Sequence, residues 1–129
     1  PNSKWSLRVQ NGEEIGRPYF VSNLAKFKNT NTLTIGWFNE DDPFTNHVGI
    51  TEHFTQYISN YHATLQYNQN SFRWVIKDGQ LRNKDGVNAW FTSTNGVLVN
   101  GKKINSEGVE LDTNDIISIG DTTLKVIIE

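Results

Sequence analysis

Short runs of β-branched and aromatic residues recur along the whole chain and are separated by Asn, Gly and Asp. Such regular alternation of short strands and turn residues is typical of an all-β sandwich or barrel. Three turns contain residues that tolerate positive φ, as short hairpin connections require: Asn11-Gly12, Asn100-Gly101 and Gly120-Asp121. These turns predict that neighbouring strands are antiparallel.

The expected strands follow these runs, and helical periodicity is nearly absent. We expect strands at residues 5–9, 19–22, 32–36, 63–67, 72–77, 96–99, 116–119 and 123–128, with shorter ones at 48–50, 103–104 and 109–111. In the strand at 72–77 larger apolar side chains alternate with the rest, so one face of that strand should be buried. Trp74 is therefore expected in the core.

A single domain is expected over residues 1–129, because this length supports one hydrophobic core and is too short for two ordinary domains. Hydrophobic residues make up 36% of the chain and charged residues 20%, which is typical of a globular domain. Because the chain begins at Pro1 and contains no Met, we expect it to be a domain excised from a longer protein.

Charge and cysteine content narrow the classes of partner. The formal net charge is −2, and nucleic acid would require clustered Lys and Arg, so no nucleic-acid partner is expected. No apolar run reaches the roughly 20 residues that cross a bilayer, and no signal peptide is visible. We therefore expect no membrane partner and take the cytoplasm as the default location. With no Cys, the chain offers neither a disulfide nor a thiolate metal site.

Two polar segments, 37–57 and 79–93, interrupt the succession of strands and are expected to be long loops of the kind that often carry function. The acidic run at 39–42 and the nearby Asn46 could supply oxygen ligands for calcium, but they lack the ordered spacing of a calcium loop. His47 and His53 are not spaced as a zinc pair. We predict no metal and no cofactor.

Five sequence blocks follow one another in a distinctive order: LTIG at 33–36, ISNYHATL at 58–65, WVIKD at 74–78, STNGVLVNG at 93–101 and LDTNDIISIG at 111–120. Each block alone is weak, whereas the ordered set is specific. Together they resemble the forkhead-associated (FHA) domain family. The resemblance implies a two-layer antiparallel β-sandwich of roughly ten or eleven strands. It also implies a signalling module for protein–protein interaction, which binds a partner phosphorylated on threonine and is not an enzyme.

The resemblance also implies which residues form the phosphopeptide site. Ser59 matches the phosphate-binding serine, and Asn60 is the neighbouring donor. Thr94 and Asn95 match positions that approach the phosphate and the peptide backbone, and the Asn95 amide can both donate and accept. The expected ligand is therefore held mainly by neutral hydrogen-bonding groups.

Three further residues are expected to support the site: Gly36, His62 and Gly96. Gly96 fits a turn that requires unusual backbone angles. His62 lies three residues after Ser59, a spacing that taken alone suggests an activated hydroxyl. An enzyme would also need an orienting acid and an oxyanion site, for which the sequence gives no sign, so we predict a structural role for His62.

One departure from the family pattern concerns phosphate directly. The family has Gly-Arg after the third strand, whereas here Gly36 is followed by Trp37. An indole cannot replace the planar, permanently charged guanidinium, so part of the usual phosphate affinity must be either absent or supplied from elsewhere. Arg82 is the first candidate, because its segment leads into Thr94, with Lys84 and Arg17 as weaker ones.

Three other functions remain open at this stage. The first is an FHA-like scaffold that binds an unmodified partner through apolar loop anchors such as Trp37, Phe38 and Trp90. The second is a carbohydrate-binding sandwich with exposed aromatic and Asn side chains. The last is an enzyme that uses Ser59 and His62.

Overall fold

The computed structural model describes residues 3–129, so residues 1 and 2, at which the expected domain begins, lie outside the described residues. Within 3–129 the chain forms thirteen strands and one helix, α1 (Val21–Lys28). The strands are β1 (Trp5–Asn11), β2 (Pro18–Tyr19), β3 (Thr32–Trp37), β4 (Val48–Ile50), β5 (Ala63–Asn68), β6 (Arg73–Asp78), β7 (Gln80–Lys84), β8 (Val87–Phe91), β9 (Val97–Val99), β10 (Lys102–Lys103), β11 (Val109–Glu110), β12 (Ile116–Ile119) and β13 (Thr122–Ile128).

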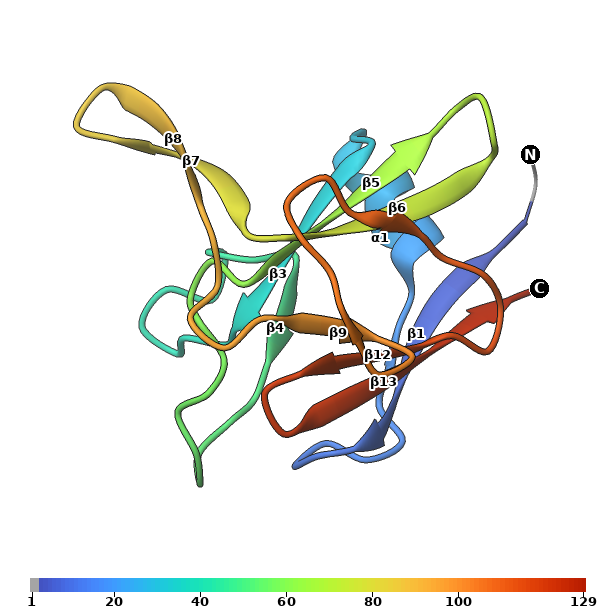
Figure 1. Cartoon of the computed structure of the whole chain (residues 1–129), viewed down its shortest axis with the longest axis horizontal. Helices are drawn as coiled ribbons and strands as arrows, with labels where there is room; N and C mark the ends of the chain where they lie inside the picture. Colours follow the sequence, from blue (N-terminus) through green and yellow to red (C-terminus); the bar gives the residue numbers. More distant parts are fainter. Residues whose placement is uncertain (1–2) are drawn as a thin grey trace.

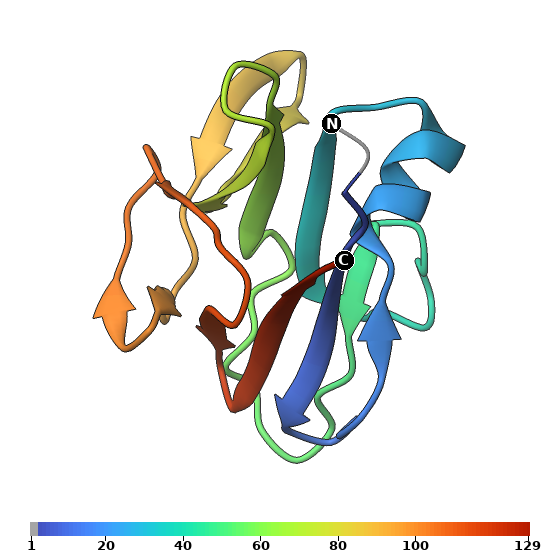
Figure 2. The same cartoon turned by 90° about the vertical axis from the view of Figure 1, so that its right-hand side faces the viewer.

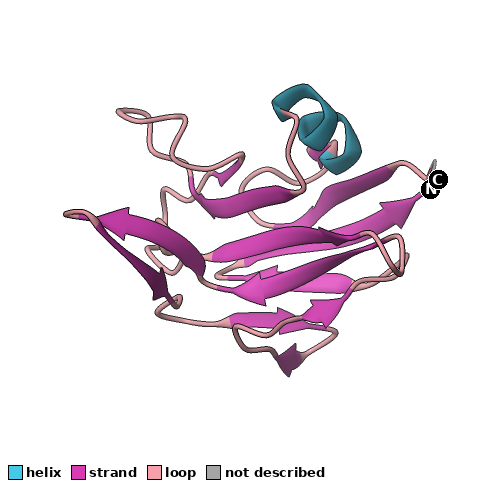
Figure 3. Ribbon diagram, turned by 90° about the horizontal axis from the view of Figure 1, so that it is seen from above, coloured by secondary structure: helices cyan, strands magenta, loops and turns pink. Residues whose placement is uncertain are grey.

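Two sheets form the body of the molecule (Figures 1 and 3). One sheet has six strands in the order β10-β9-β12-β13-β1-β2, and the other has five in the order β11-β6-β5-β3-β4. All their pairings are antiparallel except that of β3 with β4. The predicted β-sandwich is confirmed, and the eleven strands of its two sheets match the expected number.

The core lies between the two sheets, because alternate side chains of each strand point inward. Along β13 the even-numbered residues from Thr122 to Val126 are buried and the odd-numbered ones are less so. Trp74 on β6 is only 4% exposed, which confirms its expected place in the core. The first and last long strands, β1 and β13, pair with each other, and Lys4 and Glu129 exchange backbone hydrogen bonds, so the two ends of the described part of the chain lie close together (Figure 2).

The strand expected at 19–22 is wrong. Only Pro18–Tyr19 pair with β1, and the chain then forms α1, which ends at Lys28 and is capped by Asn29 with a left-handed φ of 50°. Lys26 and Lys28 lie in the last turn, where positive charge favours the helix dipole. The helix has eight residues and Val21 is its only buried one, so it leaves almost no periodic pattern in the sequence.

The loop expected at 79–93 is wrong as well. Residues 80–91 form a hairpin in which β7 and β8 pair from Gln80↔Phe91 to Lys84↔Val87. Its turn consists of Asp85 and Gly86, both with positive φ, as two-residue hairpin turns require. The hairpin belongs to neither sheet of the sandwich and projects from one end of it (Figure 1).

Two of the three predicted tight turns are confirmed. Asn100-Gly101 joins β9 to β10, and Gly120-Asp121 joins β12 to β13. Asn11-Gly12 instead opens a longer connection, because β2 begins only at Pro18. Among residues 3–129 there is no helix with the length and apolar character needed to span a bilayer.

Candidate functional site

Two connections meet at the end of the sandwich from which the hairpin projects: the β4–β5 connection, which carries Ser59, and the β8–β9 connection, which carries Thr94. The Thr94 N–H donates to Ser59 Oγ at 3.0 Å, and Asn95 Nδ2 donates to the Tyr57 carbonyl oxygen at 2.9 Å. Residues 35 positions apart in sequence are thus held side by side. The structure brings together Ser59, Thr94 and Asn95 as the sequence led us to expect.

The side chains of Ser59, Asn60 and Thr94 at this contact have hydrogen-bond donors that no described residue accepts. Because Ser59 Oγ accepts the Thr94 N–H, the hydroxyl hydrogen of Ser59 remains available for a ligand. Asn60 and Thr94 are exposed, and within residues 3–129 neither side chain has a hydrogen-bond partner. Two hydroxyls and one amide therefore face solvent at this end and can donate to an anion.

Gly36, at the end of β3, lies directly beneath the Ser59 loop. A Cβ at this position would lie 2.2 Å from the Asn60 carbonyl oxygen and 2.5 Å from Asn46 Nδ2. The following residue continues the contact, because the Trp37 N–H donates to the Ser59 carbonyl oxygen at 3.1 Å. Only glycine allows β3 and the loop to approach so closely.

His62 joins the two connections from inside. Its ring is fully buried, Nδ1 accepts the Ser59 N–H at 2.9 Å, and Nε2 donates to the Gly96 carbonyl oxygen at 2.8 Å. This pattern requires a neutral ring with its proton on Nε2. Burial lowers the pKa of His62, partly opposed by the Gly96 carbonyl and by Asp78 and Glu52.

The lowered pKa predicts how stability changes with pH. In the unfolded chain His62 binds a proton below about pH 6.5, whereas the folded ring resists it, so unfolding should become easier as the pH falls below that value. His47, whose pKa burial also lowers, should act in the same direction. Urea unfolding at pH 7.5 and at pH 5.5 should show the lower midpoint at pH 5.5, and His47→Asn should retain most of the difference. A midpoint independent of pH would contradict this role of His62.

The family model of the FHA domain matches residues 44–120, which is more than half of the chain and includes Ser59, His62, Thr94 and Asn95. This chain belongs to the FHA-domain family. No curated protein matches it significantly. Gly36 and Trp37 lie before the matched span.

Solved structures show the same fold. The FHA domain of the CT664 protein from Chlamydia trachomatis has a TM-score of 0.64 and 22% identity, over 96% of each chain. Yeast Pml1p has a TM-score of 0.69 and 16% identity, over 98% of this chain and 83% of its own. EmbR from Mycobacterium tuberculosis, in complex with a low-affinity phosphopeptide, has a TM-score of 0.63 and 22% identity; the similarity covers 98% of this chain and 24% of EmbR.

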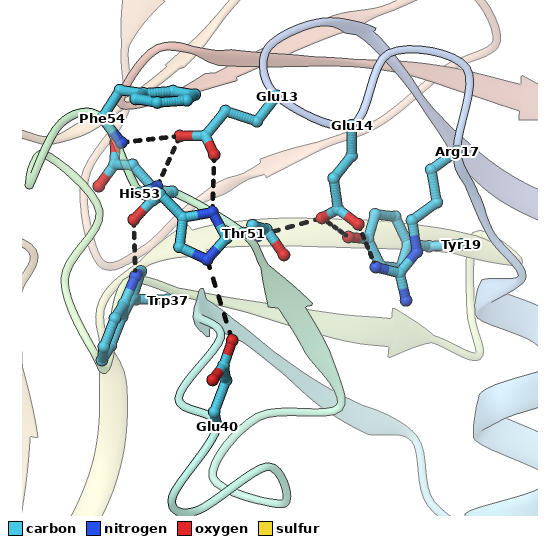
Figure 4. Close-up of polar contacts among 10 residues, drawn as sticks. Glu13, Glu14, Arg17, Tyr19, Trp37, Glu40, Thr51, His53 and Phe54 are labelled. Carbon is cyan, nitrogen blue, oxygen red and sulfur yellow. Dashed lines mark hydrogen bonds and ion pairs between the residues drawn. The ribbon is translucent and has the colours of Figure 1, made fainter.

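Trp37 is half-buried in this FHA domain and packs against the core. Its indole Nε1–H donates to the Glu52 carbonyl oxygen at 3.1 Å, as Figure 4 shows. Trp37 is therefore held at two points: its backbone N–H donates to Ser59, and its indole N–H donates to Glu52. An indole held in this way lacks any charge for an anion and offers an aromatic face instead.

Arg82 does not reach the Ser59–Thr94 contact through any hydrogen bond of the described residues. Its guanidinium donates to Gln80 Oε1 at 2.8 and 2.6 Å and to the Thr45 carbonyl oxygen at 2.7 Å. It also stacks on the Tyr61 ring, 4.4 Å from the centroid. These neutral partners leave its positive charge without a carboxylate.

Gln80 and Asn46 form a buried support that the sequence did not reveal. Gln80 Nε2 donates to the Ile35 carbonyl oxygen and to Asn46 Oδ1, both at 2.8 Å, and Asn46 Nδ2 donates to the Asn60 carbonyl oxygen at 2.7 Å. The network links the hairpin, β3 and the Ser59 loop. Asn46, considered above as a calcium ligand, is thus one of its members, and no three His, Cys, Asp or Glu residues within 3–129 are grouped to hold a metal.

Lys103 is a third residue whose position the sequence did not indicate. A Cβ on Gly96 would lie 3.1 Å from Lys103 Cε, so the lysine stem lies over the turn that carries Thr94 and Asn95. The Asn100-Gly101 turn places it there, because β10 returns along β9 with Lys103 opposite Leu98. In the sequence, the Asn100-Gly101 turn was the feature that could have indicated this position of Lys103. Among the described residues Lys103 forms no ion pair.

Proposed function

We propose that this FHA domain binds threonine-phosphorylated peptides of a protein partner at the end of the sandwich where Ser59 and Thr94 meet. The observation that carries the proposal is the Thr94 N–H···Ser59 Oγ bond of 3.0 Å, which joins the two connections and leaves the Ser59 hydroxyl hydrogen uncommitted. Phosphate oxygens are strong acceptors for such donors. Asn60 and Thr94 supply two further uncommitted groups beside it.

Asn95 is proposed to hold the peptide backbone. Its Nδ2 is anchored on the Tyr57 carbonyl oxygen, which leaves its Oδ1 and its second amide hydrogen for a ligand. A donor and an acceptor on one group can pair with the main chain of an extended peptide whatever its side chains are. Gly36, His62 and Gly96 would support the site by holding the β4–β5 and β8–β9 connections together.

The positive charge that the family takes from arginine is assigned here to Lys103, with Arg82 as a more distant contributor. Lys103 crosses Gly96 next to Thr94, and its ammonium has no carboxylate partner among the described residues. Arg82 keeps its charge but is bound to Gln80 and Thr45, so it acts through its field alone. This assignment accounts for phosphate binding without an arginine at position 37.

Lys103→Ala is expected to weaken phosphopeptide binding by about threefold to tenfold, because a solvent-exposed charge-assisted contact is modest in energy. The loss should shrink as salt rises. Titration calorimetry measures it, with the adjacent exposed Lys102→Ala as the matched control. Equal effects of the two substitutions would contradict a specific contact by Lys103.

Two solved structures with the same fold support the proposal. EmbR was solved with a phosphopeptide, and another similar structure, with 17% identity, comes from work on phosphothreonine-dependent FHA interactions.

The proposal gives Ser59 and His62 no catalytic part. The His62 nitrogens are occupied by the Ser59 N–H and the Gly96 carbonyl oxygen, so the ring does not activate the Ser59 hydroxyl.

A degenerate phosphothreonine peptide library, compared with its unphosphorylated twin, tests the function. We expect retention of a subset of the phosphorylated peptides and little retention of their twins. Equal retention of both would instead favour a scaffold that binds unmodified partners through Trp37 and other apolar groups.

A further inference from the structure

A cavity of about 340 Å³ adjoins the proposed phosphate site. Its wall includes Trp37 from the end of β3 and residues of the β4–β5 connection, among them Glu52, His53, Ile58 and Asn60. Because Asn60 belongs both to this wall and to the proposed phosphate contacts, the cavity lies next to the place proposed for the phosphothreonine. A side chain close to the phosphothreonine can therefore enter it.

Trp37 gives the cavity a fixed aromatic wall. Its backbone N–H and its indole N–H are both bonded, to the Ser59 and Glu52 carbonyl oxygens at 3.1 Å each. The half-buried ring cannot turn away without breaking the indole bond. Among aromatic side chains, indole interacts most favourably with a cation placed over its face.

Glu52 gives the same wall a buried negative group. The residue is only 6% exposed; Oε1 accepts the Ile58 N–H at 2.9 Å, and Oε2 has no hydrogen-bond partner among the described residues. That oxygen is closed to a water-sized probe and lies 3.0 Å from the place of a Cβ on Gly120, so Glu52 acts on the cavity through its charge and not as a contact atom.

Two further carboxylates lie around the cavity through His53. The Glu13 Oε1 atom lies 3.1 Å from His53 Nδ1, and Glu40 Oε1 lies 3.9 Å from His53 Nε2 (Figure 4). No Lys or Arg of the described residues lines the cavity. The local potential is therefore negative, in contrast to the Lys103 side of the phosphate site.

We propose that this cavity binds a lysine or arginine side chain of the phosphopeptide, close in sequence to the phosphothreonine. The proposal rests on the proposed function, because it needs a peptide held at Ser59. The cation would lie over Trp37, where the charges of Glu52, Glu13 and Glu40 favour it. Trp37 would thus bind a positive charge that the ligand carries. The arginine that the family has at this position would instead supply a positive charge to the phosphate.

The test uses phosphothreonine peptides selected from the library, each made with Lys, Leu or Glu at every flanking position in turn, and unphosphorylated copies. Titration calorimetry should reveal a flanking position at which Lys binds about fivefold to tenfold more tightly than Leu, and Glu most weakly. Equal affinities at every position, or a preference for Leu, would overturn the inference. Phosphate dependence in those same peptides would still uphold the proposed function, whereas its absence would contradict that function separately.

Two substitutions tie the preference to the cavity. Glu52→Gln keeps an oxygen for the Ile58 N–H but removes the charge, so the Lys peptide should lose most of its advantage while the Leu peptide binds as before. Glu40→Gln changes an exposed side chain that threatens no packing, and should reduce the advantage about twofold. Glu107→Gln, an exposed carboxylate before β11 at the opposite edge of the sheet from β4, is the matched control and should change nothing. Unchanged Lys preference in both Glu52→Gln and Glu40→Gln would refute the assignment.

Discussion

Replacing Ser59 with alanine is expected to weaken phosphopeptide binding about tenfold to a hundredfold, which corresponds to a lost hydrogen bond to a charged group of about 1.5–3 kcal/mol. The substitution removes the proposed donor to the phosphate and the acceptor that holds the Thr94 N–H. Binding of the unphosphorylated twin should hardly change. Titration calorimetry of both peptides measures the difference directly.

Ser106→Ala is the matched control, because Ser106 is exposed in the connection between β10 and β11. It should bind both peptide forms as the original chain does. A Ser59→Ala domain that folds normally and retains its phosphopeptide affinity would remove Ser59 from the site.

Replacing Gly36 with alanine is expected to destabilise the domain by about 3 kcal/mol, at the upper end of typical overpacking costs. The new Cβ would overlap the Asn60 carbonyl oxygen, a backbone atom that can move only if the Ser59 loop lifts away from β3. Phosphopeptide binding should fall together with stability. Urea unfolding followed by tryptophan fluorescence gives the free energy of unfolding.

Gly86→Ala separates the close contact from the general cost of losing a glycine. Gly86 has a φ of +82° and nothing within 4 Å of an added Cβ, so its substitution should cost roughly 1–2 kcal/mol through backbone strain alone. It should leave peptide binding unchanged. A Gly36→Ala domain as stable as the Gly86→Ala domain would contradict the close packing of the loop on β3.

The strands of the sandwich could be predicted because each buries alternate side chains, as Trp74 does on β6, and because Asn100-Gly101 and Gly120-Asp121 define their turns. The helix α1 could not be predicted, since Val21 is its only buried residue and leaves no repeat. The hairpin β7–β8 had a turn signal in Asp85-Gly86, but its strands are mostly exposed, so the alternation that marks a half-buried strand is weak.

The candidate site was predictable to the extent that its residues lie in ordered motif blocks. Ser59 and Thr94 occur in such blocks, and the structure places them in contact. Gln80, Asn46 and Lys103 could not be assigned in the same way, because their roles depend on tertiary contacts between segments far apart in the chain. The sequence indicated Arg82 as a source of the positive charge that Trp37 lacks, but in the fold its guanidinium is bound to Gln80 and Thr45.

The proposal that threonine-phosphorylated peptides bind where Ser59 and Thr94 meet can be tested directly by NMR. A library-selected phosphothreonine peptide is titrated into the ¹⁵N-labelled domain, and the shifts of the backbone amide signals are measured. We expect the largest shifts at Asn60, Thr94 and Asn95, and much smaller shifts with the unphosphorylated twin at the same concentration. Shifts of equal size with both peptides, or shifts centred on α1 at the outer face of the sandwich, would contradict it.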